Sequence, residues 1–311
     1  MKLKPEFAKE PRPFLIFLFM VAALMLSCSL KMYAGDLRVL QERTFQTQFW
    51  KNLYLNSSTG DVSITTWDKQ EVYVKIYGNK KAAEKMKFKL ESENDGIHIT
   101  AKRSSWMNWF FFGNLDVRFE IKVPTNYNVY TNTAGGDIRL NGLSGYLKLE
   151  TSGGDISLNN TKCKSSLSTS GGDITIDNNT GDIKLSTSGG DVKVNNFKGN
   201  LNASTSGGDM HLSGKGGEVH ASTSGGDIYL NFQESNQGIY LGTTGGDIVV
   251  RVPLNFSAFA DLSTTGGEVT CDIPITHNGK MTASKIKGDL NGGGKPLRCS
   301  TTGGDIKISK L

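Results

Sequence analysis

Acidic residues recur at a fixed spacing along the chain. Each occupies the fifth position of a phrase such as Thr-Ser-Gly-Gly-Asp-Ile, which occurs nine times. The first six of these acids are evenly spaced, at the interval from Asp137 to Asp155, and three more follow at longer and unequal intervals. The nine acids are Asp137, Asp155, Asp173, Asp191, Asp209, Asp227, Asp247, Glu268 and Asp305. Carboxylates stacked in this way can close backbone turns, bind calcium or cleave glycosidic bonds.

The turn interpretation accounts for the whole phrase. Paired glycines supply backbone angles that other residues avoid, and an aspartate can accept hydrogen bonds from turn N–H groups and from neighbouring Thr or Ser hydroxyls. Glu replaces Asp at positions 218 and 268, which a turn-capping role tolerates. We therefore expect the nine acids to be structural turn acids.

Calcium binding is the second interpretation. Nonapeptide β-rolls of the form GGxGxDxUx have a nine-residue half-turn and hold Ca²⁺ between turns. Here the glycines directly precede the aspartate, and the alternate half-turns place Tyr146, Lys164 and Asn200 where a roll needs acids. The pattern therefore favours no metal and no other cofactor.

Catalysis is the third interpretation, because parallel β-helices include polysaccharide-cleaving enzymes with paired carboxylates. A catalytic site is a local exception, whereas this acid is the most regular feature of the chain. No nucleophile elbow, phosphate loop or metal motif is present. His98, His211 and His220 alternate with apolar residues and so face solvent. We expect no catalytic residues and no enzyme activity.

The elements that position the acids are short strands. Apolar and polar residues alternate within each nine-residue half-period, as in Ile174-Thr175-Ile176, and Gly, Asn, Ser and Thr separate these segments. Two strands and two turns in a period of about 18 residues predict one coil of a two-sided parallel β-solenoid. The chain is therefore expected to be all-β, with neighbouring coils sharing one core.

The chain divides into three expected parts. Residues 131–311 hold the repeat, whereas residues 36–130 contain five alternating strands, a short helix near 79–89 and one degenerate copy of the phrase at Thr59-Gly60-Asp61. We expect this region to form an irregular β cap of early coils. After Asp227 the period lengthens, as the positions of Asp247 and Glu268 show.

Residues 1–34 are typical of an export signal. A basic segment precedes the apolar run Phe14 to Leu26, which is shorter than the ~20 residues of a membrane span. Three outcomes fit: cleavage before a lipidated Cys28, cleavage after Ala34, or an uncleaved anchor. We expect export to a bacterial envelope, either membrane-associated through the N-terminus, periplasmic or on the cell surface.

Composition excludes two further classes. The formal net charge of +5 on 311 residues is too mild for a nucleic-acid partner. The three cysteines beyond Cys28 are Cys163, Cys271 and Cys299, an odd number that predicts no disulfide framework. Cys271 and Cys299 are expected to be small core residues.

Several motifs together resemble a known bacterial family. They are Leu53-Tyr54-Leu55 leading into Thr59 to Ile64, the strand Val117 to Pro124, and the GGDI repeats. In this order the motifs are similar to the LiaG-like putative adhesins, a β-strand-repeat domain of unknown function. The resemblance implies an extracytoplasmic β-solenoid with an adhesive or envelope role, and it brings no catalytic residues.

One aromatic run departs from that family pattern. It contains Trp106, Trp109, Phe110, Phe111 and Phe112. Without alternation these residues do not form a strand with one buried face. They fit a plug over an open end of the solenoid or a contact tip for a membrane or partner.

These patterns predict a non-catalytic exported envelope protein that works as an adhesin or interaction scaffold. Its outward residues are mostly Ser, Thr, Lys, Asn and His, which suits cell-wall polymer, glycan or envelope-protein partners. A polysaccharide-active β-helix enzyme and a calcium-binding β-roll are the alternatives.

Overall fold

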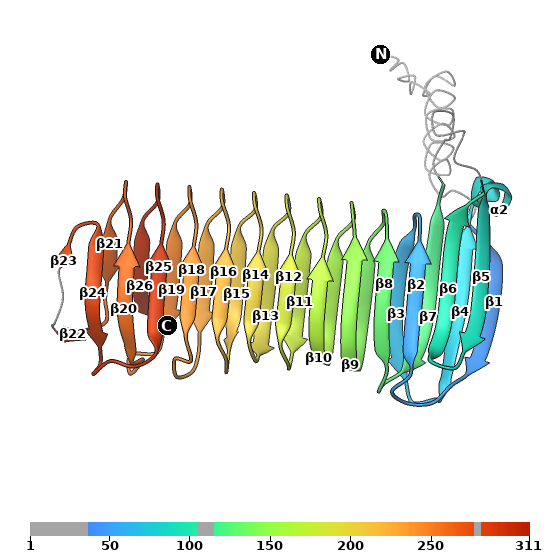
Figure 1. Ribbon diagram of the computed structural model, residues 1–311, viewed down its shortest axis with the longest axis horizontal. Coiled ribbons are helices and arrows are strands. Elements are labelled where there is room, and N and C mark those ends of the chain that lie inside the picture. The colour runs from blue at the N-terminus through green and yellow to red at the C-terminus, as the bar shows by residue number, and fades with distance from the viewer. Residues whose placement is uncertain (1–36, 105–114, 277–280) are drawn as a thin grey trace, which may run out of the picture.

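The protein is an elongated β-solenoid built from two sheet layers, as the computed structural model shows (Figure 1). The structure describes residues 37–104, 115–276 and 281–311. In these ranges the only helix is α2 (Lys80–Lys85), which begins at the N-cap Asn79. The prediction of an all-β, two-sided parallel solenoid is confirmed.

The regular coils occupy the middle of the chain and repeat at the predicted interval. Ile156 pairs with Ile174 and Ile174 with Val192, both in parallel register. The strands are β9 (Ile138–Thr151), β10 (Ile156–Ser168), β11 (Ile174–Asn179), β12 (Ile183–Ser186), β13 (Val192–Lys198), β14 (Leu201–Ser204), β15 (Met210–Lys215), β16 (Val219–Ser222), β17 (Ile228–Phe232), β18 (Ile239–Gly242) and β19 (Ile248–Val252).

Each coil contributes one strand to each layer. We name the layer that follows the repeated acids the first layer; it contains β11, β13, β15, β17 and β19, each paired with the next. The second layer contains β12, β14, β16 and β18. The long strands β9 and β10 bend and contribute to both layers.

In the N-terminal region the spatial order of the strands differs from their order in the sequence. Its strands are β1 (Arg38–Gln46), β2 (Asn52–Ser57), β3 (Asp61–Trp67), β4 (Glu71–Gly78), β5 (Met86–Glu93), β6 (Gly96–Arg103), β7 (Val117–Pro124) and β8 (Asn128–Thr133). Strand β2 lies between β6 and β8, and β3 lies between β7 and β9. The coil of Asp61 is therefore internal, and β1, β4 and β5 close the end in antiparallel pairs.

The boundary predicted near residue 130 falls within β8, which pairs in parallel with β2 and β9. The strands on both sides of residue 130 thus belong to one continuous stack. The division into a cap and a repeat domain stays a prediction.

The C-terminal coils also depart from sequence order. Their strands are β20 (Ala258–Ser263), β21 (Val269–Cys271), β22 (Ile275–Thr276), β23 (Met281–Thr282), β24 (Lys285–Leu290), β25 (Pro296–Ser300) and β26 (Ile306–Lys310). Strand β25 lies between β18 and β20, and β26 lies between β19 and β21.

The last coils are not stacked in sequence order. The coil of Asp305 lies between the coil of Asp247 and the coil of Glu268, which is nearer the end of the stack. Figure 1 accordingly shows the C-terminus set back from the end that β22 to β24 form. Strand β24 pairs antiparallel with β20, so the parallel stack ends there in a hairpin-like edge.

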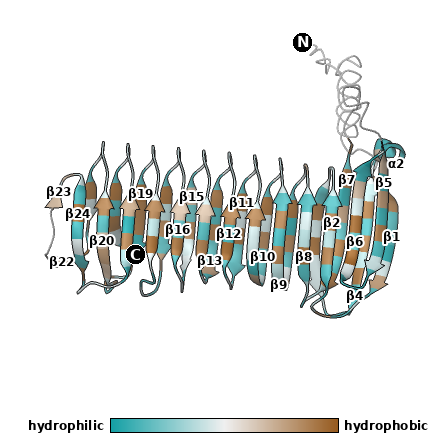
Figure 2. Ribbon diagram, viewed as in Figure 1, coloured by the Kyte–Doolittle hydropathy of each residue, from teal (hydrophilic) through white to brown (hydrophobic). Residues whose placement is uncertain are grey.

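The core is a set of columns that run along the solenoid between the two layers. Ile156, Ile174, Val192, Met210 and Ile228 are fully buried in one column. Figure 2 shows the resulting alternation of hydrophobic and hydrophilic bands along the strands. No coil buries its apolar side chains alone, so each coil depends on its neighbours for stability.

In the coils that contain Asn160, Asn178 and Asn196, the two turns are chemically different. One turn contains the Thr-Ser-Gly-Gly-Asp phrase, and the other contains Asn160, Asn178 and Asn196, all at positive φ. Asparagine tolerates this left-handed backbone region better than most residues. The Nδ2 of each later asparagine donates to Oδ1 of the earlier one at 3.1 Å, so this turn also joins adjacent coils.

Candidate functional site

The repeated phrase forms an inter-coil clasp. Thr169 Oγ1 donates to Gly154 O of the preceding coil at 2.9 Å and accepts from Gly172 N at 3.3 Å. Equivalent threonines from Thr151 to Thr301 make the same pair of bonds. The threonine hydroxyl is thus used twice, once within its turn and once between coils.

The second glycine of the phrase is required by space. A Cβ placed on Gly172 would lie 2.1 Å from Gly154 O, whereas one on Gly171 would meet nothing nearer than 3.9 Å. The same contrast recurs at Gly189 and Gly190. Only the second glycine therefore lets adjacent turns approach at the strand spacing.

The acids form a column of main-chain acceptors. Asp155 Oδ1 accepts from Asp173 N, and Asp173 Oδ1 accepts from Asp191 N, both at 2.8 Å. The acceptors in spatial order are Asp61, Asp137, Asp155, Asp173, Asp191, Asp209, Asp227, Asp247 and Asp305. This geometry is that of a turn acid, and the contribution of these bonds to stability stays a prediction.

Glu268 stands at the outer end of this column. Its main-chain N–H donates to Asp305 Oδ1 at 2.8 Å. Within the described residues no further turn follows it, so its own carboxylate receives no equivalent N–H. The substitution of Glu for Asp therefore falls at the one position of the column that has no following coil to bind.

The outward carboxylate oxygens meet side chains of the same turn. Arg139 donates to Asp137 Oδ2 at 2.6 Å, and Tyr229 Oη donates to Asp227 Oδ2 at 3.0 Å. This hydrogen bond is the largest cause that raises the pKa of Tyr229. The column thus meets hydrogen-bond donors, and the described residues place no histidine or cysteine in contact with it that could complete an acid–base pair.

The three described cysteines, Cys163, Cys271 and Cys299, are free thiols. Cys163 and Cys299 are buried, which matches the core position predicted for Cys299, whereas Cys271 is only half-buried. Burial raises the pKa of Cys163 to about 11 and raises the pKa of Cys299 still further above its ordinary value. Thiols with such pKa values are poor nucleophiles at neutral pH.

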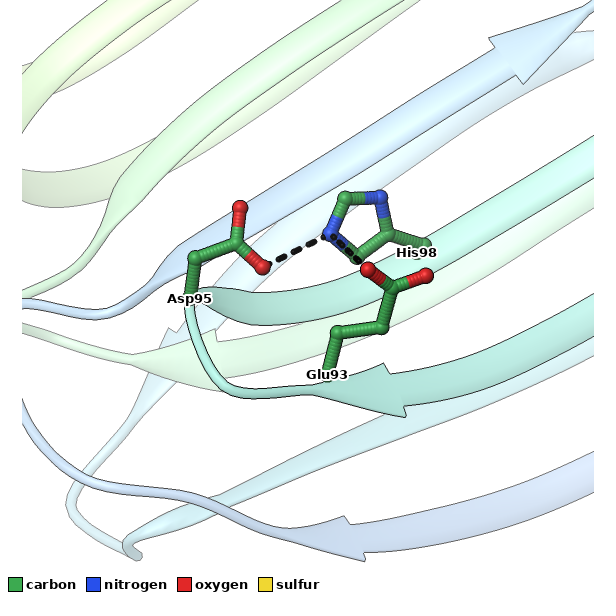
Figure 3. Close-up of side chains that lie close together, drawn as sticks. All are labelled: Glu93, Asp95 and His98. Carbon is green, nitrogen blue, oxygen red and sulfur yellow. Dashed lines mark hydrogen bonds and ion pairs between the residues drawn. The ribbon is translucent and has the colours of Figure 1, made fainter.

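One group of ionisable side chains escaped the sequence reasoning. Glu93 and Asp95 converge on His98 across the turn between β5 and β6 (Figure 3), with His98 Nε2 3.0 Å from Asp95 Oδ1 and 3.8 Å from Glu93 Oε2. The hydrogen bond with His98 lowers the pKa of Asp95. All three side chains are 30% or more exposed, and exposed groups of this kind are common without an ion.

That group adjoins a row of stacked aromatic rings on the second layer. The ring of Tyr54 lies 4.6 Å from that of His98 and 4.9 Å from that of Tyr130. Farther along the same layer, His220 stacks on Tyr240 at 4.5 Å, and the Arg298 guanidinium lies 5.9 Å from the Tyr240 ring. The outward histidines thus stack on tyrosines of adjacent coils.

Sequence reasoning did not place Tyr240, Arg298 and Asp261 beside His220. Each of the four lies three residues before the threonine of its phrase, and this spacing puts them at one position of the coil. The sequence therefore contained the signal for their shared position in the coil. It did not show that Arg298 would be the neighbour of Tyr240, because that depends on the spatial order of the last coils.

Two predicted features lie outside the described residues. They are the lipidation candidate Cys28 and the aromatic run with Trp106, Trp109, Phe110, Phe111 and Phe112. Among the helices of the described ranges, none combines the length and apolar character that crossing a bilayer requires.

Comparison with solved structures finds similar folds at low sequence identity. Two of them are a putative adhesin from Parabacteroides distasonis (10% identical, TM-score 0.48) and a putative adhesin from Bacteroides fragilis (13% identical, TM-score 0.44). In both comparisons the alignment covers 89% of this chain and 98% of the other. No curated protein matches the chain.

A family model described as Toastrack DUF4097 matches residues 50–309, which is most of the sequence and includes both the early coils and the GGD repeats. The family resemblance predicted from the repeats is confirmed. The chain belongs to the Toastrack DUF4097 family.

Proposed function

We propose that the protein is a non-catalytic interaction scaffold of the bacterial cell envelope or surface. The observation that carries the proposal is the unbroken register of outward side chains along the second layer. From Tyr130 this register passes through Lys148, Ser166, Lys184 and Asn202, with one residue per coil. A ligand with a repeating structure can meet one outward side chain at every coil.

The proposed scaffold is stiff because side-chain hydrogen bonds join its coils, at one turn along the whole repeat and at the other turn from Asn160 to Asn196. The Thr and Asp bonds join coils at one turn, and the asparagine bonds join them at the other. Within the described residues, thirteen strands follow one another along the second layer from β5 to β24, a length of roughly 58 Å at the usual strand spacing of ~4.8 Å. A surface of this length favours polymers or extended partners over small metabolites.

The enzyme alternative has less support. Its carboxylates would have to act as an acid and base pair on either side of a glycosidic bond. The column acids instead share one arrangement in every coil, with one oxygen bonded to a main-chain N–H. A catalytic pair needs two carboxyl groups in unlike environments.

The calcium alternative is weakened by the same bonds. A β-roll uses its aspartate oxygens as calcium ligands between turns, whereas here Oδ1 of each column aspartate accepts a main-chain hydrogen bond. We therefore retain the interaction scaffold, exported by the N-terminal segment, as the proposal.

Incubation of the full-length protein with isolated bacterial envelopes and with a panel of envelope and plant glycans tests the proposal. We expect retention on at least one of these materials without release of soluble sugar. Release of sugar that Asp173→Asn abolishes and Asp191→Asn does not would overturn it, because only a catalytic carboxylate acts at one coil alone. The absence of retention on every material would also overturn it.

A further inference from the structure

The second layer carries a groove along its outer surface. One hollow of about 550 Å³ is bordered by His220, Tyr240, Asp261 and Arg298, and a neighbouring hollow of about 350 Å³ is bordered by Lys164, Lys184 and Glu218. Asn202 and His220 border both hollows; the larger hollow also includes residues that follow them on their strands, such as Ser222, and the smaller one includes residues that precede them, such as Asn200. The larger hollow, which we call the groove, crosses β14, β16, β18, β25 and β20.

The groove has a wall and a floor that the repeat itself produces. Its wall is the outward row that contains Asn202, His220, Tyr240 and Arg298 in register. Two residues farther along each strand the side chains are small, and they lie beside that wall: Ser204, Ser222, Gly242, Ser300 and Ser263. A row of large side chains next to a row of small ones leaves a trough parallel to the solenoid axis.

The charge of the groove is balanced. Among the residues that line it, the one Lys or Arg is Arg298 and the one carboxylate is Asp261. Glu218 pairs with His220 at 3.4 Å and Asp261 with Lys287 at 3.7 Å. One cation against one acid gives no field that would attract a polyanion, so nucleic acid and highly acidic polymers are poor fits.

The chemistry of the wall suits hydroxyl groups. Amide, hydroxyl, imidazole, carboxylate and guanidinium groups alternate along it, and together they can both donate to and accept from sugar hydroxyls. The Tyr240 ring has His220 against one face and Arg298 near the other, so its edge and its Oη are the parts that remain for a ligand. Recognition here would rely on hydrogen bonds more than on stacking of sugar rings.

The length of the groove favours a chain over a single sugar. Five strands at ~4.8 Å spacing span roughly 19 Å. An extended polysaccharide advances by a comparable distance at each sugar residue, so successive sugars can lie over successive coils. We propose that this groove binds a linear, uncharged polysaccharide along the solenoid axis. The inference rests on the proposed scaffold function and adds its binding site and ligand class.

The first layer supplies a matched control. His211 stacks on Tyr229 at 4.8 Å there, as His220 does on Tyr240, but Tyr229 borders neither hollow. The variants Tyr240→Ala and Arg298→Ala should therefore lose binding, whereas Tyr229→Ala should keep it. All three side chains lie on the outer surface, and thermal unfolding of each variant checks that the fold is retained.

The experiment measures affinity by gel retardation and calorimetry with hydroxyethyl cellulose, mixed-linkage β-glucan, xylan and dextran as uncharged probes, and with polygalacturonate as an acidic probe. We expect binding to at least one uncharged probe, weakened about tenfold by Tyr240→Ala or Arg298→Ala, as the loss of one or two hydrogen bonds predicts, and unchanged within about twofold by Tyr229→Ala. Equal effects of Tyr240→Ala and Tyr229→Ala, binding to polygalacturonate alone, or no binding to any uncharged probe would overturn the proposal.

Failure of the groove proposal can be distinguished from failure of the scaffold function. If envelopes retain the protein and the Tyr240→Ala variant is retained equally well, the groove proposal fails and the scaffold function stands. If no envelope or glycan retains the wild-type protein, the scaffold function itself fails.

Discussion

The two glycines of one phrase should respond in opposite ways to the same substitution. Gly172→Ala places a methyl group 2.1 Å from Gly154 O and 2.4 Å from Gly154 C, both in the backbone of the preceding coil. Gly171→Ala places it 3.9 Å from the nearest atom, which is ordinary van der Waals contact. The two variants thus differ by one position in one turn and by steric overlap alone.

The size of the effect follows from these distances. Cβ atoms essentially never approach other atoms within 3.0 Å, so the Gly172→Ala turn must move from its neighbour by about 0.9 Å. That movement would stretch the bond from Asp173 N to Asp155 Oδ1, now 2.8 Å, beyond hydrogen-bonding distance. Overpacking costs about 1–3 kcal/mol and a lost hydrogen bond about 1 kcal/mol. We expect the free energy of unfolding to fall by about 3 kcal/mol, the sum of a mid-range overpacking cost and one lost bond.

Gly171→Ala should leave stability unchanged or raise it by about 0.4–1 kcal/mol, because alanine restricts the unfolded chain. That unfolded-state gain is common to both variants and cancels in their comparison. Urea unfolding followed by circular dichroism measures the difference. Equal loss of stability in both variants, or a loss for Gly172→Ala no larger than the about 0.5 kcal/mol of an ordinary surface substitution, would show that adjacent turns are not packed as closely as the structure has them.

Three further predictions concern the turn acids and thiols. Asp173→Ala should lower the free energy of unfolding by about 1 kcal/mol, whereas Asp173→Asn, which keeps an oxygen acceptor, should lose less in the same urea titration; equal losses would argue against the acceptor role. Thermal unfolding should occur at the same temperature with EDTA and with excess Ca²⁺, and a large rise with Ca²⁺ would favour the β-roll interpretation. In a Cys28→Ser background at pH 8, a thiol reagent should modify half-buried Cys271 before buried Cys163, whose pKa is raised to about 11 and whose thiolate is therefore scarce. Faster reaction of Cys163 would mean that its coil opens.

The sequence predicts the regular coils well because period and burial coincide there. Alternation within the nine-residue half-period predicted that Ile174 and Ile176 point inward, and both are fully buried. The parallel register between coils follows from the constant interval with no further information. In this region the alternation within a strand and the contacts between coils require apolar residues at the same positions, since every coil packs on a near copy of itself.

The end coils could not be ordered from the sequence for the same reason. The phrases at Thr264 and Thr301 make equivalent hydrogen bonds to their neighbours, so either would fit next to the coil of Asp247. What separates them is the antiparallel pairing of β20 with β24, a long-range contact that no repeat encodes. The order of the early coils is ambiguous in the same way, because β2 pairs in parallel with β6 on one side and with β8 on the other.

The candidate groove depends on this unpredicted order. His220 and Tyr240 come from successive coils, but Arg298 reaches Tyr240 only because β25 inserts between β18 and β20. In sequence order Asp261 would have stood beside Tyr240, and the charge at that point of the wall would have been reversed. The insertion therefore does two things with one set of strands. It places the C-terminal coil within the stack, where both its faces are paired, and it sets a cation between the aromatic part of the groove and the acid that follows. The insertion of β25 between β18 and β20 thus determines which side chains the groove presents. For this reason the polysaccharide proposal is tested at Arg298 as well as at Tyr240.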